Sequence, residues 1–182
     1  MADSRTYVTA DTHFGHAEAI GLFKRPFASV EAMDDAMVAA INEVVGPGDR
    51  LLHLGDFTGP IRPKRDLVEF AKSIRRRLRC RTIELVAGNH DPIDREDFRA
   101  IFEAVHELPS WKDDSGLRIV CCHYPLRTWQ GRLKGAVHLY GHCHGALPDD
   151  GRSTDVGVEA RGFRPVELRS LVEELASRPI GV

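Results

Sequence analysis

The sequence predicts an α/β fold whose N-terminal half is a parallel βαβαβ unit. Short apolar runs, rich in β-branched residues, lie at residues 6–10, 50–54 and 82–87 and have the length of buried strands. An amphipathic helical pattern lies between each pair of these runs. Helices between strands indicate crossover connections, so the three strands are expected to run parallel.

The two crossover helices are marked by their ends and by their apolar stripes. Ser29 can cap the first helix, which is expected to end at Gly46-Pro47-Gly48. The second helix is expected at residues 64–78, where apolar side chains recur at steps of three and four. Both stripes are predicted to face the core.

The pattern changes in the second half of the chain. A short helix is expected at residues 97–102, and the last helix near Ser170, whose spacing to Glu173 fits a capping box. Five strands are expected between these two helices, at residues 105–108, 111–112, 117–122, 136–140 and 154–159. The first three of them are separated by turn signals and not by helical patterns.

Length and composition predict one domain, residues 1–182, without a cap domain. The net charge of -2 gives no general attraction to nucleic acid or to an acidic membrane. The N-terminus does not resemble a signal peptide, and no apolar stretch is long enough for a membrane span. The four cysteines lack the spacing of a secreted disulfide scaffold, so a cytoplasmic protein is expected.

Side chains that can bind metal follow the predicted strands. Because the carboxyl ends of strands in an α/β sheet are where functional groups converge, these segments are expected to meet at one site. Single segments of this kind are often turns or caps, but the ordered set is specific. The segments are Asp11-Thr12-His13, Gly55-Asp56, Gly88-Asn89-His90-Asp91, His123 and Gly141-His142-Cys143-His144.

The donor types favour two divalent transition-metal ions. Imidazole and carboxylate together suit Mn, Fe, Zn, Ni or Co, whereas Mg and Ca prefer oxygen alone, and manganese is the metal we expect. Asp56 is suited to bridge two ions through its two oxygens, and Asn89 offers a neutral amide oxygen. Neutral ligands preserve the positive charge that acidifies a bound water.

The ordered set, spanning residues 11–144, resembles the calcineurin-like metallophosphoesterase superfamily, and in particular its small, uncapped bacterial and phage members. The resemblance implies a four-layer αββα sandwich with mixed sheets. It implies one metal site from Asp11, His13, Asp56 and His144, and a second site from Asp56, Asn89, His123 and His142.

The resemblance also implies a reaction. A hydroxide that bridges the two metals would attack phosphorus, and His90, oriented by Asp91, would assist the leaving group. The small size and missing cap favour an open site, so the prediction is a phosphodiesterase for nucleotide-like diesters such as cyclic nucleotides or nucleic-acid ends. A general phosphomonoesterase and a non-catalytic scaffold for protein partners are the alternatives.

Two loops and one helix end are candidates for substrate contacts. His16 and Arg25 in one loop, and Tyr124 and Arg127 in the other, are the predicted contacts, because arginine beside aromatic residues suits a phosphate next to a stacked base. Ordinary loop packing is the alternative. The basic residues between Lys72 and Arg81 indicate either a solvated helix end or a nucleic-acid groove.

A structural zinc site is a further alternative for part of the set. It would use Cys121, Cys122, His123, His142 and Cys143, but adjacent cysteines lack the usual Cys-x-x-Cys spacing. Such a site would also leave the aspartates without a role. Of the remaining histidines, His53 and His138 are expected to be buried and structural, and His106 to be either structural or exposed.

Overall fold

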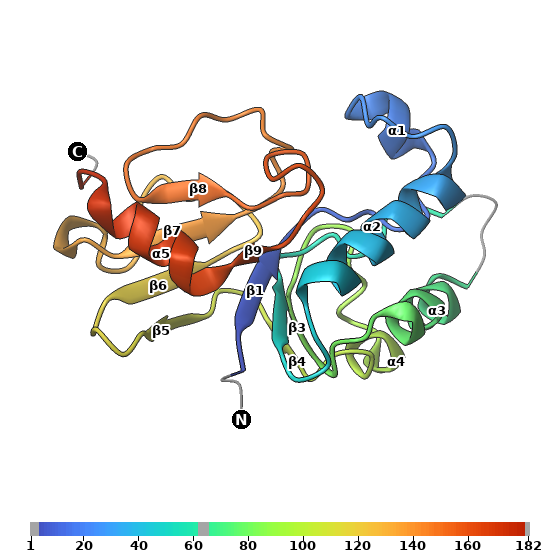
Figure 1. Cartoon of the computed structure of the whole chain (residues 1–182), viewed down its shortest axis with the longest axis horizontal. Helices are drawn as coiled ribbons and strands as arrows, with labels where there is room; N and C mark the ends of the chain where they lie inside the picture. Colours follow the sequence, from blue (N-terminus) through green and yellow to red (C-terminus); the bar gives the residue numbers. More distant parts are fainter. Residues whose placement is uncertain (1–3, 62–65, 181–182) are drawn as a thin grey trace.

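The fold is a sandwich of two mixed sheets, seen in a computed structural model whose described residues are 4–61 and 66–180. Figure 1 shows the two sheets side by side, with helices α2 (Val30–Val44), α3 (Leu67–Arg77) and α4 (Glu96–Arg99) on the outer face of the first sheet. The first sheet has the order β4-β3-β2-β1-β9, and its strands are β1 (Thr6–Thr9), β2 (Arg50–His53), β3 (Thr82–Val86), β4 (Ala104–His106) and β9 (Val166–Glu167). The second has the order β5-β6-β7-β8, with strands β5 (Ser110–Lys112), β6 (Arg118–Cys121), β7 (Val137–Tyr140) and β8 (Ser153–Asp155).

The parallel pairing predicted for the N-terminal half is confirmed. Strands β1, β2 and β3 pair in parallel, and β4 continues the parallel run beside β3. In the second sheet β6, β7 and β8 are also parallel. The antiparallel pairs, β1 with β9 and β5 with β6, make both sheets mixed.

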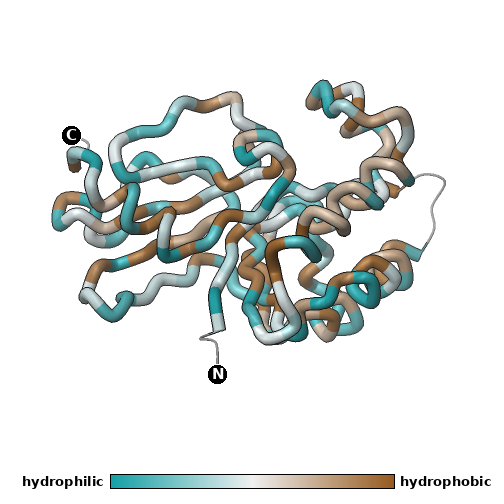
Figure 2. The backbone as a smooth tube through the Cα atoms, in the orientation of Figure 1, coloured by the Kyte–Doolittle hydropathy of each residue, from teal (hydrophilic) through white to brown (hydrophobic). Residues whose placement is uncertain are grey.

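Alternation along the strands creates two cores. Tyr7 and Leu51 face helices α2, α3 and α4, whereas Val8 and Leu52 face the second sheet. Helix α5 (Leu168–Ser177) contributes its apolar side chains to the core between the sheets. Figure 2 shows the matching alternation of hydrophilic and hydrophobic residues along the helices.

The outer face of the second sheet has a thinner cover. His138 on β7 stacks on Trp129 from the segment that follows β6, at a centroid distance of 5.1 Å. The same segment carries a short 3-10 helix, η1 (Arg132–Lys134). The predicted α/β class with two mixed sheets is confirmed, and this layer is built of loop more than of helix.

The helix starts show how local capping decides boundaries. Ser29 caps α2 as predicted, its hydroxyl accepting the Ala32 N–H at 3.2 Å. Helix α3 begins at Leu67, where Asp66 caps the Val68 N–H, and the predicted start at residue 64 lies outside the described residues. The capping box predicted at Ser170 is wrong. Helix α5 begins at Leu168, and the carboxylate of Glu167 accepts the Ser170 N–H at 2.9 Å.

Two short elements were not expected from the sequence. Helix α1 (Glu18–Leu22) lies in the segment interpreted as a loop, and Figure 1 shows it projecting beyond α2. Strand β9 has two residues, too few to give an alternating pattern. Among the described residues, no helix has both the length and the apolar character of a bilayer span.

Candidate metal centre

The predicted ligands lie in the loops after five strands, and both sheets bring these loops to the same edge. Asp11 and His13 follow β1, Asp56 follows β2, and Asn89 follows β3. From the second sheet, His123 follows β6, and the loop after β7 carries His142 and His144. The convergence of parallel strand ends therefore assembles a site from residues far apart in the sequence.

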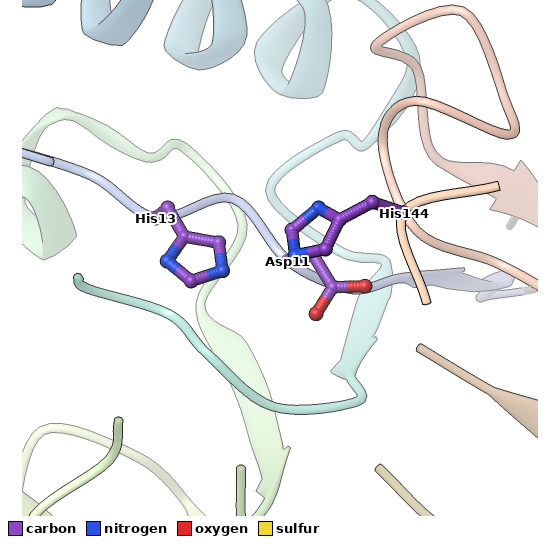
Figure 3. Close-up of side chains that lie close together, drawn as sticks. All are labelled: Asp11, His13 and His144. Atoms are coloured by element: carbon purple, nitrogen blue, oxygen red, sulfur yellow. The ribbon is translucent and has the colours of Figure 1, made fainter. Parts of the chain in front are cut away.

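Three groups of potential ligands form within this site. In each group the ligand atoms lie within 4.8 Å of one another. Figure 3 shows the first group, Asp11, His13 and His144, whose side chains lie close together. The other two groups are His13, Asp56 and His90, and Asp56, His123 and His142.

His13 joins the first group to the second, and Asp56 joins the second to the third. Its Oδ2 lies 3.4 Å from His13 Nε2 and 3.5 Å from His123 Nε2. His123 Nε2 in turn lies 3.0 Å from Asn89 Oδ1 and 3.2 Å from His142 Nδ1. A carboxylate between two sets of nitrogen and oxygen donors is the arrangement that a bridging ligand requires.

The residues present fit divalent transition-metal ions. Within the described part of the chain, His13 Nε2 is buried without a hydrogen-bond partner, a costly state for a polar atom that a cation would relieve. The donors around it are imidazole and carboxylate, the set that suits Mn, Fe, Co, Ni and Zn. None of the three groups includes a cysteine, which argues against the alternative structural zinc site.

The backbone at the ligands is held in an uncommon conformation. Seven non-glycine residues of the described ranges have positive φ, and five of them are predicted ligands. Left-handed φ costs free energy in any residue with a Cβ, and it persists where the surrounding structure imposes it. The five residues, with φ between 49° and 70°, are Asp11, His13, Asp56, His142 and His144.

Glycine allows the ligand loops to approach one another closely. A Cβ at Gly88 would lie 2.3 Å from the backbone nitrogen and from Oδ1 of Asp56. A Cβ at Gly141 would lie 2.7 Å from Asp11 Oδ2. The glycine of each motif therefore makes room for a carboxylate contributed by another strand.

Hydrogen bonds fix the orientation of the ligands. His123 Nδ1 lies 2.8 Å from the carbonyl oxygen of Leu54, so Nδ1 carries the proton and Nε2 is left as the donor to a cation. The Asp11 carboxylate accepts the His142 N–H at 2.8 and 3.0 Å, which ties the loops of the two sheets together. His90 donates its backbone N–H to Asp56 Oδ1 at 2.9 Å.

Burial shifts the protonation of the cluster toward neutral forms. It raises the pKa of Asp11 well above its ordinary value, and the nearby carboxylate of Asp56 raises it further. Burial also lowers the pKa of His13, with His144 and Arg25 adding to the effect. A neutral imidazole can donate a lone pair to a cation. The positive charge of a bound cation would also stabilise the ionised forms of the carboxylates, which repel each other without it.

Asp91 interacts with the backbone of neighbouring loops. Its two oxygens accept the N–H groups of Asp56, Phe57 and Gly88 at 2.8 to 3.0 Å. Burial raises its pKa to about 7 against the opposing effect of these N–H groups. The role predicted for Asp91 as the acid that orients His90 stays a prediction, and the contacts seen here hold the loops after β2 and β3 together.

The four predicted substrate contacts occupy different environments. His16 lies at the site, with its Nδ1 3.3 Å from that of His13. Tyr124 is exposed and packs edge-on to His142, at a centroid distance of 4.7 Å. Arg127 is exposed, and its carbonyl accepts a bond from Arg132. Arg25 is buried, and its guanidinium is bonded to protein groups, so the contact expected with substrate is replaced by internal ones.

The residues expected to be structural lie away from the three groups or beneath them. His53 is buried with Nε2 2.9 Å from the Thr12 hydroxyl, and His138 Nδ1 lies 2.9 Å from the Ser153 hydroxyl. His106 pairs with Glu84. The basic residues between Lys72 and Arg81 lie where α3 leads into the start of β3, at the edge opposite the ligands, and Arg77 there pairs with Asp35.

Sequence reasoning missed Glu159 and Phe23. Glu159 Oε2 lies 3.0 Å from His144 Nδ1, and Phe23 stacks on the His144 ring. The segment 154–159 was interpreted as one strand, but β8 ends at Asp155, whose carboxylate accepts the Gly157 N–H. The glycine inside that apolar run was the available signal, because an isolated glycine in a strand pattern often marks a bend.

Comparison with known proteins gives the same assignment. Residues 4–166 match the family model of the calcineurin-like phosphoesterases. The uncharacterized protein MJ1445 of Methanocaldococcus jannaschii is 27% identical in an alignment of 183 positions that covers 95% of this chain and 92% of that protein. The crystal structure of AQ665 from Aquifex aeolicus, a protein of unknown function, has a similar fold, with a TM-score of 0.72, 23% identity, and coverage of 94% of this chain and 100% of that chain. With the family model matched along most of its length and the ligand groups assembled, the chain belongs to the calcineurin-like phosphoesterase family.

Proposed function

We propose that this phosphoesterase is a phosphodiesterase for nucleotide-like diesters and that it works with two divalent transition-metal ions, manganese first among them. The observation that carries the proposal is the position of Asp56, whose Oδ2 lies within 3.5 Å of histidine nitrogens from both ligand sets. Two cations bridged there would lower the pKa of a water and neutralise charge on the phosphate. His13 and His144 would hold one ion, and His123 and His142 the other.

His90 is the proposed proton donor to the leaving group. It is half-buried, its ring lies 5.3 Å from that of His13 and 6.2 Å from that of His16, and its backbone is bonded to Asp56. A histidine at this position could protonate an alkoxide as it leaves. Asp91 would support it indirectly, by fixing the loop that carries His90.

The charges at the site favour a diester over a monoester. A monoester carries up to two negative charges near neutral pH and is best held by additional cationic side chains, whereas a diester carries one. Arg25 has its donors bonded to the carbonyl oxygens of Asp11 and Thr12 and to Glu159. This supports a site in which the metals, and not arginine, provide the positive charge.

The exposure of one side of the cluster supports a phosphodiester substrate, in which the phosphate is esterified on two sides. Asn89, His142 and Tyr124 are exposed, so the Asp56, His123 and His142 group is reached by solvent on the side of His142, whereas Asp56 and His123 are buried. A bulky second ester group can extend from such a site, and the Tyr124 ring can pack against a base. The proposed substrates are therefore small nucleotide diesters or the ends of nucleic-acid chains.

The test compares substrates under matched metal loading. Protein freed of metal is loaded in turn with Mn, Ni, Co, Zn and Mg and assayed with bis-p-nitrophenyl phosphate, p-nitrophenyl phosphate, and 2′,3′- and 3′,5′-cyclic nucleotides. We expect the diesters to have the higher kcat/KM with Mn. The variant Asp56→Ala, purified in parallel, controls for contaminating enzymes. A preference for the monoester would overturn the diester assignment, and no hydrolysis of any substrate would support the scaffold alternative.

A further inference from the structure

A buried glutamate from the second sheet contacts a predicted metal ligand. Glu159 Oε2 lies 3.0 Å from His144 Nδ1, and both side chains are nearly buried, with 11% and 13% of their area exposed. Both atoms are buried, and within the described residues neither forms a hydrogen bond of good geometry, so their 3.0 Å approach is a close polar contact and not an aligned hydrogen bond. No other hydrogen bond in the described residues competes for either atom.

Arg25 holds the other oxygen of the same glutamate. Its Nε and Nη2 each lie 2.7 Å from Glu159 Oε1, and its side chain is fully buried. The same guanidinium donates to the carbonyl oxygens of Asp11, at 2.7 Å, and of Thr12, at 2.9 Å. A planar guanidinium with several fixed donors can make these bonds at once, which a lysine ammonium cannot do in the same geometry.

These contacts join two strained loops. Asp11 has a φ of 58° and His144 a φ of 49°, so both ligand loops depend on contacts that hold their backbone. The Phe23 ring stacks on His144 at a centroid distance of 3.4 Å and an interplanar angle of 12°. Thus His144 is held at its ring face by Phe23 and at Nδ1 by Glu159.

We propose that Arg25 and Glu159 are positioning residues that prepare His144 and Asp11 to bind one of the two metal ions. Glu159 accepts the proton on Nδ1 of His144, which leaves Nε2 as the lone-pair donor toward Asp11 and His13. A carboxylate behind a ligating histidine fixes its tautomer and ring orientation and strengthens it as a ligand. The proposal rests on the proposed function, because it takes His144 to be a metal ligand.

The chain contains a matched control for this arrangement. Glu84 also pairs with a histidine and an arginine, His106 Nε2 at 2.9 Å and Arg50, and its side chain is 12% exposed. That group of three lies on β2, β3 and β4 and includes none of the predicted ligands. Glu84→Gln therefore removes a charge of similar burial and similar partners without touching the metal centre.

The experiment measures metal affinity in addition to activity. Mn²⁺ binding to the full chain is followed by equilibrium dialysis for the wild type, Glu159→Gln and Glu84→Gln. We expect two Mn²⁺ ions per wild-type chain, with one of the two affinities reduced about 10- to 100-fold in Glu159→Gln. The other affinity, and both affinities of Glu84→Gln, are expected to stay unchanged. Two unchanged affinities in Glu159→Gln, or an equal loss at both sites, would overturn the proposal.

Two further measurements keep the proposal testable if Glu159→Gln does not fold. Arg25→Lys keeps the charge and loses part of the bonding, so it is expected to weaken the same affinity by a smaller factor, and no change would contradict the proposal. In the metal-free wild type, ¹⁵N NMR is expected to show the His144 proton on Nδ1, and a proton on Nε2 would overturn it. Wild-type protein that binds fewer than two Mn²⁺ ions would instead refute the proposed function, while the NMR result still decides the role of Glu159.

Discussion

Replacing Asp34 by asparagine is expected to stabilise the protein at pH 8 and to change little at pH 4. Asp34 lies on α2 and is 5% exposed, and its carboxylate accepts the Gly15 N–H at 3.1 and 3.2 Å. Burial raises its pKa from 3.8 to about 6, more than the Gly15 bond and the charge of Arg77 lower it. The ionised form of the Asp34 carboxylate therefore lowers the stability of the folded protein.

The sign and size of the effect follow from the two pKa values. The unfolded chain releases this proton near pH 3.8, and the folded chain releases it near pH 6. Between these values the folded state binds more protons, so stability falls as the pH rises through this window and then stays constant. The shift corresponds to about 3 kcal/mol at pH 8, which is the upper limit of the gain from a neutral side chain. Asparagine keeps an oxygen that can accept the Gly15 N–H.

The assay is urea unfolding of the wild type and Asp34→Asn at pH 4 and pH 8, with EDTA present so that metal binding does not contribute. Asp35→Asn is the control, because the neighbouring Asp35 is exposed and pairs at the surface with Arg77. We expect a gain for Asp34→Asn at pH 8 that largely disappears at pH 4, and a small effect of Asp35→Asn. A loss of stability at pH 8 would refute the reasoning that burial of the Asp34 charge dominates its bond to Gly15.

Four other substitutions test the site and the core. Asp56→Ala and His142→Ala are expected to abolish metal-dependent hydrolysis, since each removes a ligand, and activity retained by either variant in a steady-state assay would refute the ligand assignment. Gly88→Ala is expected to lose about 1 to 3 kcal/mol of stability, because its Cβ would lie 2.3 Å from the Asp56 nitrogen. Urea unfolding measures this loss, and an unchanged stability would contradict the close approach of the two loops. Burial lowers the pKa of His138 from 6.5 to about 4, so its neutral form contributes stability above pH 6.5 that is lost as the pH falls toward 4, about 3 kcal/mol in all. His138→Gln should flatten this acid dependence in unfolding experiments, and an unchanged pH profile would count against it.

The placement of the ligands could be predicted from the sequence because it depends on one topological rule. Once helices separate the first strands, the strands run parallel, and the side chains that follow them meet at one edge. Asp11 and Asp56 illustrate this, because they follow β1 and β2, which pair in parallel from Thr6 with Arg50 to Thr9 with His53. His142 was predictable for the same reason, as β7 lies in the parallel part of the second sheet.

The contacts that orient the ligands were not predictable, because they depend on tertiary structure. Glu159 meets Arg25 across 134 positions of the chain, and neither residue belongs to a recognisable motif. Arg25 was predicted to bind substrate because an arginine between aromatic residues in a loop often does. Its burial against the Asp11 and Thr12 carbonyl oxygens is a property of the folded loop and not of the local pattern.

The most direct test of the account is the number and position of metal ions in the folded protein. Anomalous diffraction from crystals of the Mn-loaded protein would locate them independently of any substrate. We expect two peaks, roughly 3.5 to 4 Å apart, on either side of the Asp56 carboxylate. A single peak, or two peaks that do not share Asp56, would contradict the two-metal account of this site.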